Sequence, residues 1–135
     1  MAYIFNPTGG VTRNDANGLG YFNAPRGYHK HDGSDWTLPL GVGQIVTPAA
    51  EGIFERVSYP YKNTKEISGL RIRSEVLEIE MFYFEPDRSL LGTWLHAGQP
   101  IGIAQDCTAF YKNPKDGDLP HIHVGIIRCS QIILM

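Results

Sequence analysis

The chain has no hydrophobic run that approaches the length of a membrane-spanning segment, so we do not expect it to interact with a membrane. It also has little excess charge, because 12 basic and 14 acidic residues are interspersed along the sequence and give a formal net charge of -2. Electrostatic binding to nucleic acid is therefore not expected either. Partners must be inferred from a local site.

Cysteine is scarce. Cys107 and Cys129 are too few for a disulfide framework, and their spacing is not typical of a metal knuckle. We expect free thiols, with a single bridge as the alternative. The N-terminal segment lacks the basic stretch and the apolar core of a signal peptide. If the protein acts outside a cytoplasm, we expect another route, such as release by lysis or transport in a virus particle.

A sustained helical period is also lacking, since no segment carries one for more than two turns. The 15 glycines and 9 prolines divide the chain into short runs, most of which alternate apolar with polar residues. A length of 135 residues with 42% hydrophobic residues suits one domain with a real core. We predict an all-β fold, a single domain of antiparallel sheets that form a groove. It comprises residues 20–127, after an irregular arm (1–19) and before a C-terminal tail (128–135).

Charged residues alternate with apolar residues in two neighbouring runs. Arg71 and Arg73 line one face of the first run, and Glu78 and Glu80 line one face of the second. On adjacent antiparallel strands, such rows can form cross-strand pairs worth about 0.2–1 kcal/mol each. We favour a simpler interpretation, in which the charged residues form a solvated sheet face.

Two segments that contain histidine predict a metal site. On a strand, the motif His121-x-His123 points both imidazoles to the same face. Far earlier in the sequence, His31 and Asp35 flank Gly33, where the backbone can bend to bring one more imidazole and one carboxylate to the same point. Such a set leaves room for a water molecule, as in a catalytic zinc site. The alternative is an ordinary polar strand that faces solvent.

Four motifs follow one another along the chain: His31-x-Gly33-x-Asp35, Thr47-Pro-Ala-Ala-Glu-Gly52, Gly92-x5-Gly98-Gln-Pro-Ile-Gly102 and His121-x-His123. Their order resembles that of the lysostaphin-type zinc metallopeptidases, which cut the cross-bridges and stem peptides of bacterial peptidoglycan. The resemblance covers about residues 20–127. It implies the lysostaphin-type metallopeptidase fold, with a β-walled groove that holds an extended peptide.

The resemblance also implies roles for individual residues. His31, Asp35 and His123 correspond to the Zn2+ ligands, whereas His121 corresponds to a catalytic residue beside the zinc rather than to a fourth ligand. An imidazole there can take a proton or stabilise a developing oxyanion. The alternative for His121 is a polar residue that only supports the site. In some family members an upstream asparagine occupies the open zinc position, a role that Asn14, Asn17 or Asn23 could fill here.

One position departs from the family pattern. Active members usually carry a second catalytic histidine some nine residues before the glycine equivalent to Gly92, where this chain has Tyr83. A phenol can donate a hydrogen bond to an oxyanion, but it is a poor general base at neutral pH. Glu85 is a further candidate base, provided that no bulge separates it from the face of Tyr83. Residues 81–86 are also similar to leukocyte cell-derived chemotaxin, a secreted family member that keeps the zinc but is not regarded as a peptidase.

Two functions are compatible with these motifs. The first is a zinc endopeptidase that degrades peptidoglycan peptides, such as a phage lysis protein, an endolysin, or a virion-associated protein that acts on the cell wall. The second is a catalytically impaired, zinc-stabilised binding or structural module of the same fold. Tyr83 favours the module, and His121 favours the enzyme.

Overall fold

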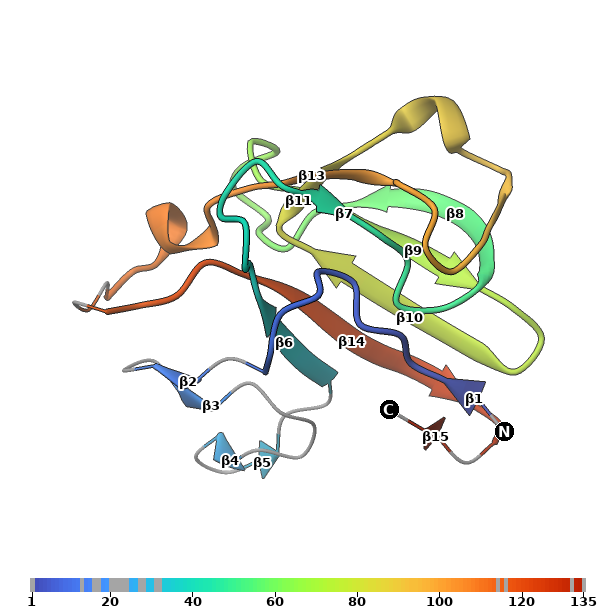
Figure 1. Ribbon diagram of the computed structural model, residues 1–135, viewed down its shortest axis with the longest axis horizontal. Helices are drawn as coiled ribbons and strands as arrows, with labels where there is room; N and C mark the ends of the chain where they lie inside the picture. The colour runs from blue at the N-terminus through green and yellow to red at the C-terminus, as the bar shows by residue number, and fades with distance from the viewer. Residues whose placement is uncertain are drawn as a thin grey trace.

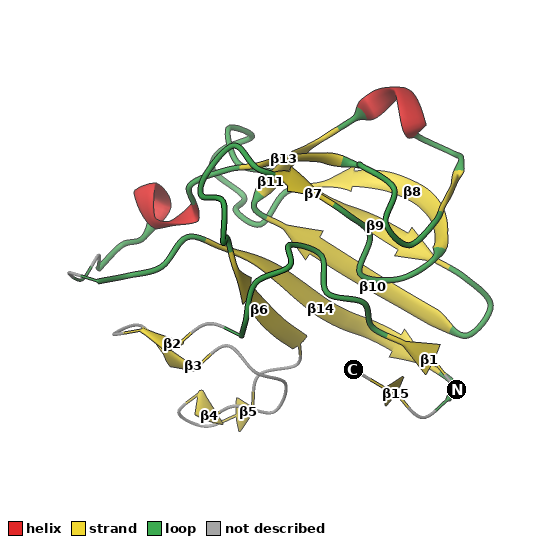
Figure 2. Ribbon diagram, in the orientation of Figure 1, coloured by secondary structure: helices red, strands yellow, loops and turns green. Residues whose placement is uncertain are grey.

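The computed structural model describes residues 2–12, 14–15, 18–19, 25–26, 29–30, 33–113, 115, 117–131 and 133–134 (Figure 1). Almost all of the regular structure in these residues is β-strand, and their only helical segments are two short 3-10 turns, η1 (Arg88–Leu90) and η2 (Cys107–Phe110) (Figure 2). Within the same ranges no helix has the length and apolar character needed to cross a membrane. The prediction of an all-β fold is confirmed.

Two sheets form the body of the protein. The six-stranded sheet has the order β12 (Trp94–Leu95), β8 (Gly52–Ser58), β9 (Gly69–Arg73), β10 (Leu77–Phe82), β14 (His121–Cys129) and β6 (Gly33–Thr37). The three-stranded sheet has the order β11 (Phe84–Pro86), β13 (Gly102–Ala104) and β7 (Ile45–Val46). All pairings in both sheets are antiparallel, as predicted.

Short strand pairs flank these sheets. They are β1 (Ala2–Tyr3) with β15 (Ile133–Leu134), β2 (Asn14–Asp15) with β3 (Gly18–Leu19), and β4 (Pro25–Arg26) with β5 (His29–Lys30). The β1–β15 pair is parallel, unlike the prediction of antiparallel sheets, and it joins the two ends of the chain (Figure 1). It holds the N-terminal and C-terminal segments together.

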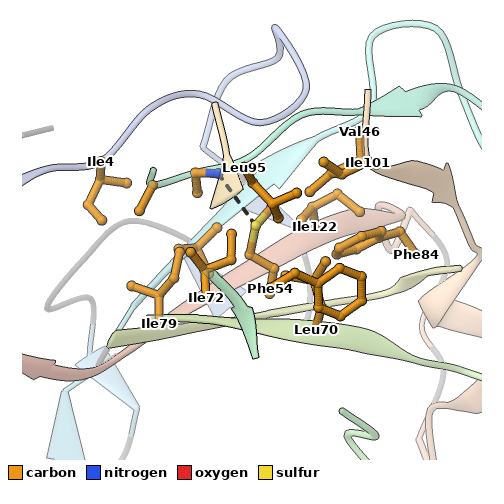
Figure 3. Close-up of a cluster of buried hydrophobic side chains, with 14 of the residues drawn as sticks. Ile4, Val46, Phe54, Leu70, Ile72, Ile79, Phe84, Leu95, Ile101 and Ile122 are labelled. Carbon is orange, nitrogen blue, oxygen red and sulfur yellow. Dashed lines mark hydrogen bonds between the residues drawn. The ribbon is translucent and has the colours of Figure 1, made fainter. Parts of the chain in front are cut away.

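The core draws side chains from both sheets. On β10, Leu77, Ile79 and Met81 are buried, while the intervening residues are half-buried, as expected of a strand with one apolar face. Val46 and Phe84 contribute to the same cluster from the three-stranded sheet (Figure 3). The N-terminal segment takes part as well, since Ala2 and Ile4 are buried in the cluster. The start of the predicted irregular arm therefore packs on the sheets through these two side chains.

The polar face of the large sheet differs from our interpretation. Arg71 lies opposite Glu80 in the register of β9 and β10. Its guanidinium lies 3.3 Å from Glu80 and 3.5 Å from Glu78, and all three side chains are less than one quarter exposed. The predicted alternation is correct, but the interpretation as a simply solvated face is wrong, because residues of opposite charge on adjacent strands pair and shield each other.

Tyr83 marks the point where the chain passes from one sheet to the other. Phe82 ends β10 and Phe84 begins β11, and between them Tyr83 has a φ of 82°, the only positive φ of a non-glycine residue in the described ranges. The carbonyl of Ser68 accepts the N–H groups of both Tyr83 (2.8 Å) and Phe84 (3.2 Å). Such a backbone costs about 1–3 kcal/mol and persists only where its surroundings enforce it.

Gly69 lies where β9 and β10 pack closely, so a substitution there tests this packing. A Cβ at this position would overlap the carbonyl oxygen of Met81 on β10, whereas the nearest atom to a Cβ at Gly125 would be in the His123 side chain, at 3.1 Å. We expect Gly69→Ala to lower the free energy of unfolding by about 1–3 kcal/mol, and Gly125→Ala by less. Urea unfolding of both variants measures this difference, and equal losses would contradict the strand register.

Candidate functional site

A buried carboxylate lies at the centre of the candidate site. Strands β6 and β14 pair so that Asp35 lies directly opposite His123. Asp35 is only 2% exposed, and its Oδ1 lies 2.6 Å from Nδ1 of His123. Its Oδ2 lies 3.6 Å from Nε2 of His121. The prediction that the His121-x-His123 motif directs both imidazoles to one face is confirmed, because both reach the same carboxylate.

This donor set is chemically suited to zinc, which takes imidazole nitrogen and carboxylate oxygen as ligands. A buried carboxylate also needs a cationic partner, which either a protonated imidazole or a metal ion can supply. The structure brings together two of the three predicted ligands, Asp35 and His123. The third, His31, lies outside the described residues. Within the part of the chain that is described, no group of three or more His, Cys, Asp or Glu residues forms a metal site.

His121 is held in a defined orientation. It is 3% exposed, and its Nδ1 lies 2.9 Å from the carbonyl oxygen of Leu119. Because a carbonyl oxygen can only accept, this contact places a proton on Nδ1. In the neutral imidazole, Nε2 is then the nitrogen that can take a proton, and it is the nitrogen that faces Asp35.

Tyr83 lies against both histidines. Its ring meets that of His121 edge-on, with centroids 5.3 Å apart, and lies 6.5 Å from the ring of His123. Burial, followed by the nearby Tyr61, raises the pKa of the Tyr83 hydroxyl well above its ordinary value of 10.0. The pKa of Tyr61 is raised as well, and burial is the largest cause for both tyrosines. Tyr83 is therefore a hydrogen-bond donor at neutral pH rather than a base.

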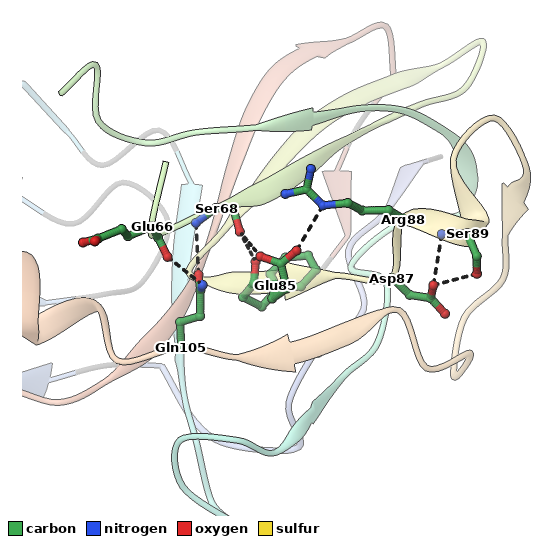
Figure 4. Close-up of polar contacts among 8 residues, drawn as sticks. Glu66, Ser68, Glu85, Asp87, Arg88, Ser89 and Gln105 are labelled. Carbon is green, nitrogen blue, oxygen red and sulfur yellow. Dashed lines mark hydrogen bonds and ion pairs between the residues drawn. The ribbon is translucent and has the colours of Figure 1, made fainter. Parts of the chain in front are cut away.

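Glu85 belongs to a different cluster of polar side chains. Its carboxylate accepts hydrogen bonds from the hydroxyl of Ser68 (3.1 Å) and from Nε of Arg88 (3.1 Å), as Figure 4 shows. The suggestion that Glu85 shares the face of Tyr83 required an uninterrupted strand. The positive φ of Tyr83 breaks that strand, so the structure does not support Glu85 as the base.

Cys107 is a neighbour of the site that was not predicted from the sequence. Its Sγ lies 3.5 Å from Nδ1 of His121 and 3.8 Å from the hydroxyl of Tyr111. Together with Asp35, this resembles the order of a Cys–His–Asp triad. However, burial raises the pKa of the Cys107 thiol to about 11, and the thiolate is the nucleophilic form. Cys107 therefore packs behind His121 as a neutral thiol.

The two cysteines do not pair. Both are free thiols, as expected, and Cys129 donates to the carbonyl of Gln131 at 2.9 Å. No signal in the sequence connects Cys107 to His121, because the contact depends on the path of the chain after the turn η2.

A pocket of about 480 Å³ adjoins the candidate site. It is lined by residues 56–62, Thr64, Lys65, Glu80 and Phe82. The ring of Phe82 stacks on His123, with centroids 6.3 Å apart and planes 14° from parallel. Tyr61, which contributes to the raised pKa of Tyr83, lines the same pocket. The side chain of Phe82 therefore lies between the pocket and His123, and neither His121 nor His123 lines the pocket itself.

No protein-family model matches the chain, and no curated protein matches it either. Any functional assignment therefore depends on the motif order and on the geometry of the site. Three asparagines were predicted as possible occupants of the open zinc position. Asn17 and Asn23 lie outside the described residues, as does the side chain of Asn14.

The two thiols are expected to differ in reactivity. In the native protein at pH 8, a disulfide reagent such as DTNB should modify Cys129, which is partly exposed. Cys107 should react only after unfolding, because it is fully buried and its raised pKa keeps it protonated. A folded Cys129→Ser variant should therefore give almost no increase in absorbance with this reagent. Rapid reaction of that folded variant would contradict the placement of Cys107.

Proposed function

We propose that this protein is a zinc-dependent endopeptidase that hydrolyses peptide bonds of bacterial peptidoglycan. The observation that carries the proposal is the convergence of His121 and His123 on the buried carboxylate of Asp35. In this proposal His31, Asp35 and His123 hold the metal. When bound there, zinc supplies a water molecule with a pKa near neutrality and a Lewis acid for the scissile carbonyl.

Other residues of the chain would provide the remaining catalytic and binding groups. His121 would take and hold a proton at Nε2, in the orientation that the carbonyl of Leu119 imposes through Nδ1. Tyr83, which stays protonated, would donate a hydrogen bond to the developing oxyanion. Phe82 and Tyr61 would line the path by which an extended peptide reaches the histidines.

Tyr83 also supports a second candidate function, a zinc-stabilised binding or structural module without peptidase activity. The active members of the family that the motifs resemble usually carry a histidine at this position. A phenol whose pKa is raised by burial cannot act as the base that this histidine provides. In the module, the same metal would hold the loops together while the pocket binds a ligand without cleaving it.

Digestion of purified bacterial sacculi with zinc-loaded protein separates the two functions. Mass spectrometry should detect new peptide termini with the intact protein, but not after chelation of the metal. His121→Ala should lower the rate at least about 100-fold, because it removes the proton acceptor. His96→Ala is the matched control, since this side chain is 69% exposed and contacts Glu51 instead. If no termini form while zinc is bound stoichiometrically, the protein is a module.

Substitution of Tyr83 tests its role separately. We expect Tyr83→His to raise the rate of hydrolysis, because an imidazole titrates near neutrality, and histidine is among the residues enriched at positive φ. Tyr83→Phe keeps the ring but loses the donor, and should lower the rate. Rates of both variants on the same sacculi provide the test. A loss of activity in Tyr83→His as large as in Tyr83→Phe would show that the phenol itself is required.

A further inference from the structure

The pocket beside the candidate site has an excess of positive charge. Three of its lining residues, Arg56, Lys62 and Lys65, are basic, and only Glu80 is acidic. Glu80 already pairs with Arg71 at 3.3 Å and with Arg56 at 3.8 Å. Its charge is therefore shared between two guanidinium groups, and the two lysines have no carboxylate of their own within the pocket lining.

Both lysines are exposed, and Lys65 lies over an aromatic ring. The ammonium group of Lys65 lies 5.6 Å from the centre of the Tyr59 ring, a cation–π contact that holds the charge beside the pocket. Tyr61 and Phe82 extend the aromatic lining toward Tyr83 and His123. A ligand that fits this lining has an anionic group for the lysines and apolar or planar groups for the rings.

Ser58 forms part of the buried base of the pocket. It is only 5% exposed and lines the pocket at the end of β8. Its hydroxyl is buried and has no hydrogen-bond partner among the described residues.

We propose that this pocket binds a carboxylate of an acidic peptide and thereby selects peptides with an acidic residue near the bond that lies at His123. The volume of about 480 Å³ is within the usual range of small-ligand sites and exceeds what a lone inorganic anion requires. This inference rests on the proposed function, because it names the substrate class of the same site. It is testable through binding alone, without hydrolysis.

The experiment is an NMR titration of the full chain at low salt with two blocked tetrapeptides, acetyl-Ala-Glu-Ala-Ala-amide and its glutamine counterpart. The glutamate peptide should shift the backbone amides of residues 58–65 and bind at least ten times more tightly than the glutamine peptide. A Lys62→Gln/Lys65→Gln double variant should lose this preference, and it should remain folded because both side chains are exposed. Arg73→Gln, which removes one positive charge away from the pocket, is the control, because Arg73 lies at the end of β9 and pairs with Glu55.

Other outcomes would overturn the inference. These are equal binding of the two peptides, an unchanged preference in the double variant, and inorganic phosphate that binds as tightly as the glutamate peptide, which would indicate a general anion site. Failure of the proposed function is a separate result. If sacculi stay intact while the glutamate peptide is preferred, the proposed peptidase activity is contradicted but carboxylate binding in the pocket is not. If sacculi are hydrolysed and neither peptide is preferred, only carboxylate binding in the pocket is contradicted.

Discussion

The pairing of β6 with β14 is the constraint on which the candidate site depends. It sets Asp35 opposite His123 in a buried position, where a carboxylate is stable only with hydrogen bonds and a compensating positive charge. His123 supplies a hydrogen bond, and His121 on the same strand places its Nε2 3.6 Å from the other carboxylate oxygen. The same pairing brings together segments that lie at opposite ends of the sequence, so the site can form only when the large sheet is complete.

Tyr83 connects this site to the rest of the fold. The chain changes sheets at this residue, and the strained backbone that makes the change possible also places the ring against His121 and His123. Strain of this kind is often found at functional sites, where the surrounding structure enforces it. The hydroxyl of Tyr83 interacts with Tyr61, which lines the cationic pocket. Fold, candidate site and pocket are therefore linked through one side chain.

Much of this could be predicted from the sequence, and the reasons are local. Alternation in residues 77–82 predicted a strand with one buried face, and the spacing of His121 and His123 predicted two imidazoles on one face. Features that depend on distant segments could not be predicted in the same way. No glycine or asparagine signals the positive φ of Tyr83, because hydrogen bonds to Ser68 enforce it. The contact between Cys107 and His121 likewise depends on how separate segments pack.

The central claim is that Asp35 and His123, with His31, hold a zinc ion through oxygen and nitrogen donors. X-ray absorption spectroscopy of the full chain after zinc loading tests this claim most directly, with Asp35→Asn as the comparison. We predict a bound zinc with only nitrogen and oxygen ligands, and much weaker binding in the variant. A sulfur ligand would indicate Cys107 instead, and this result, like the absence of tightly bound zinc, would contradict the claim.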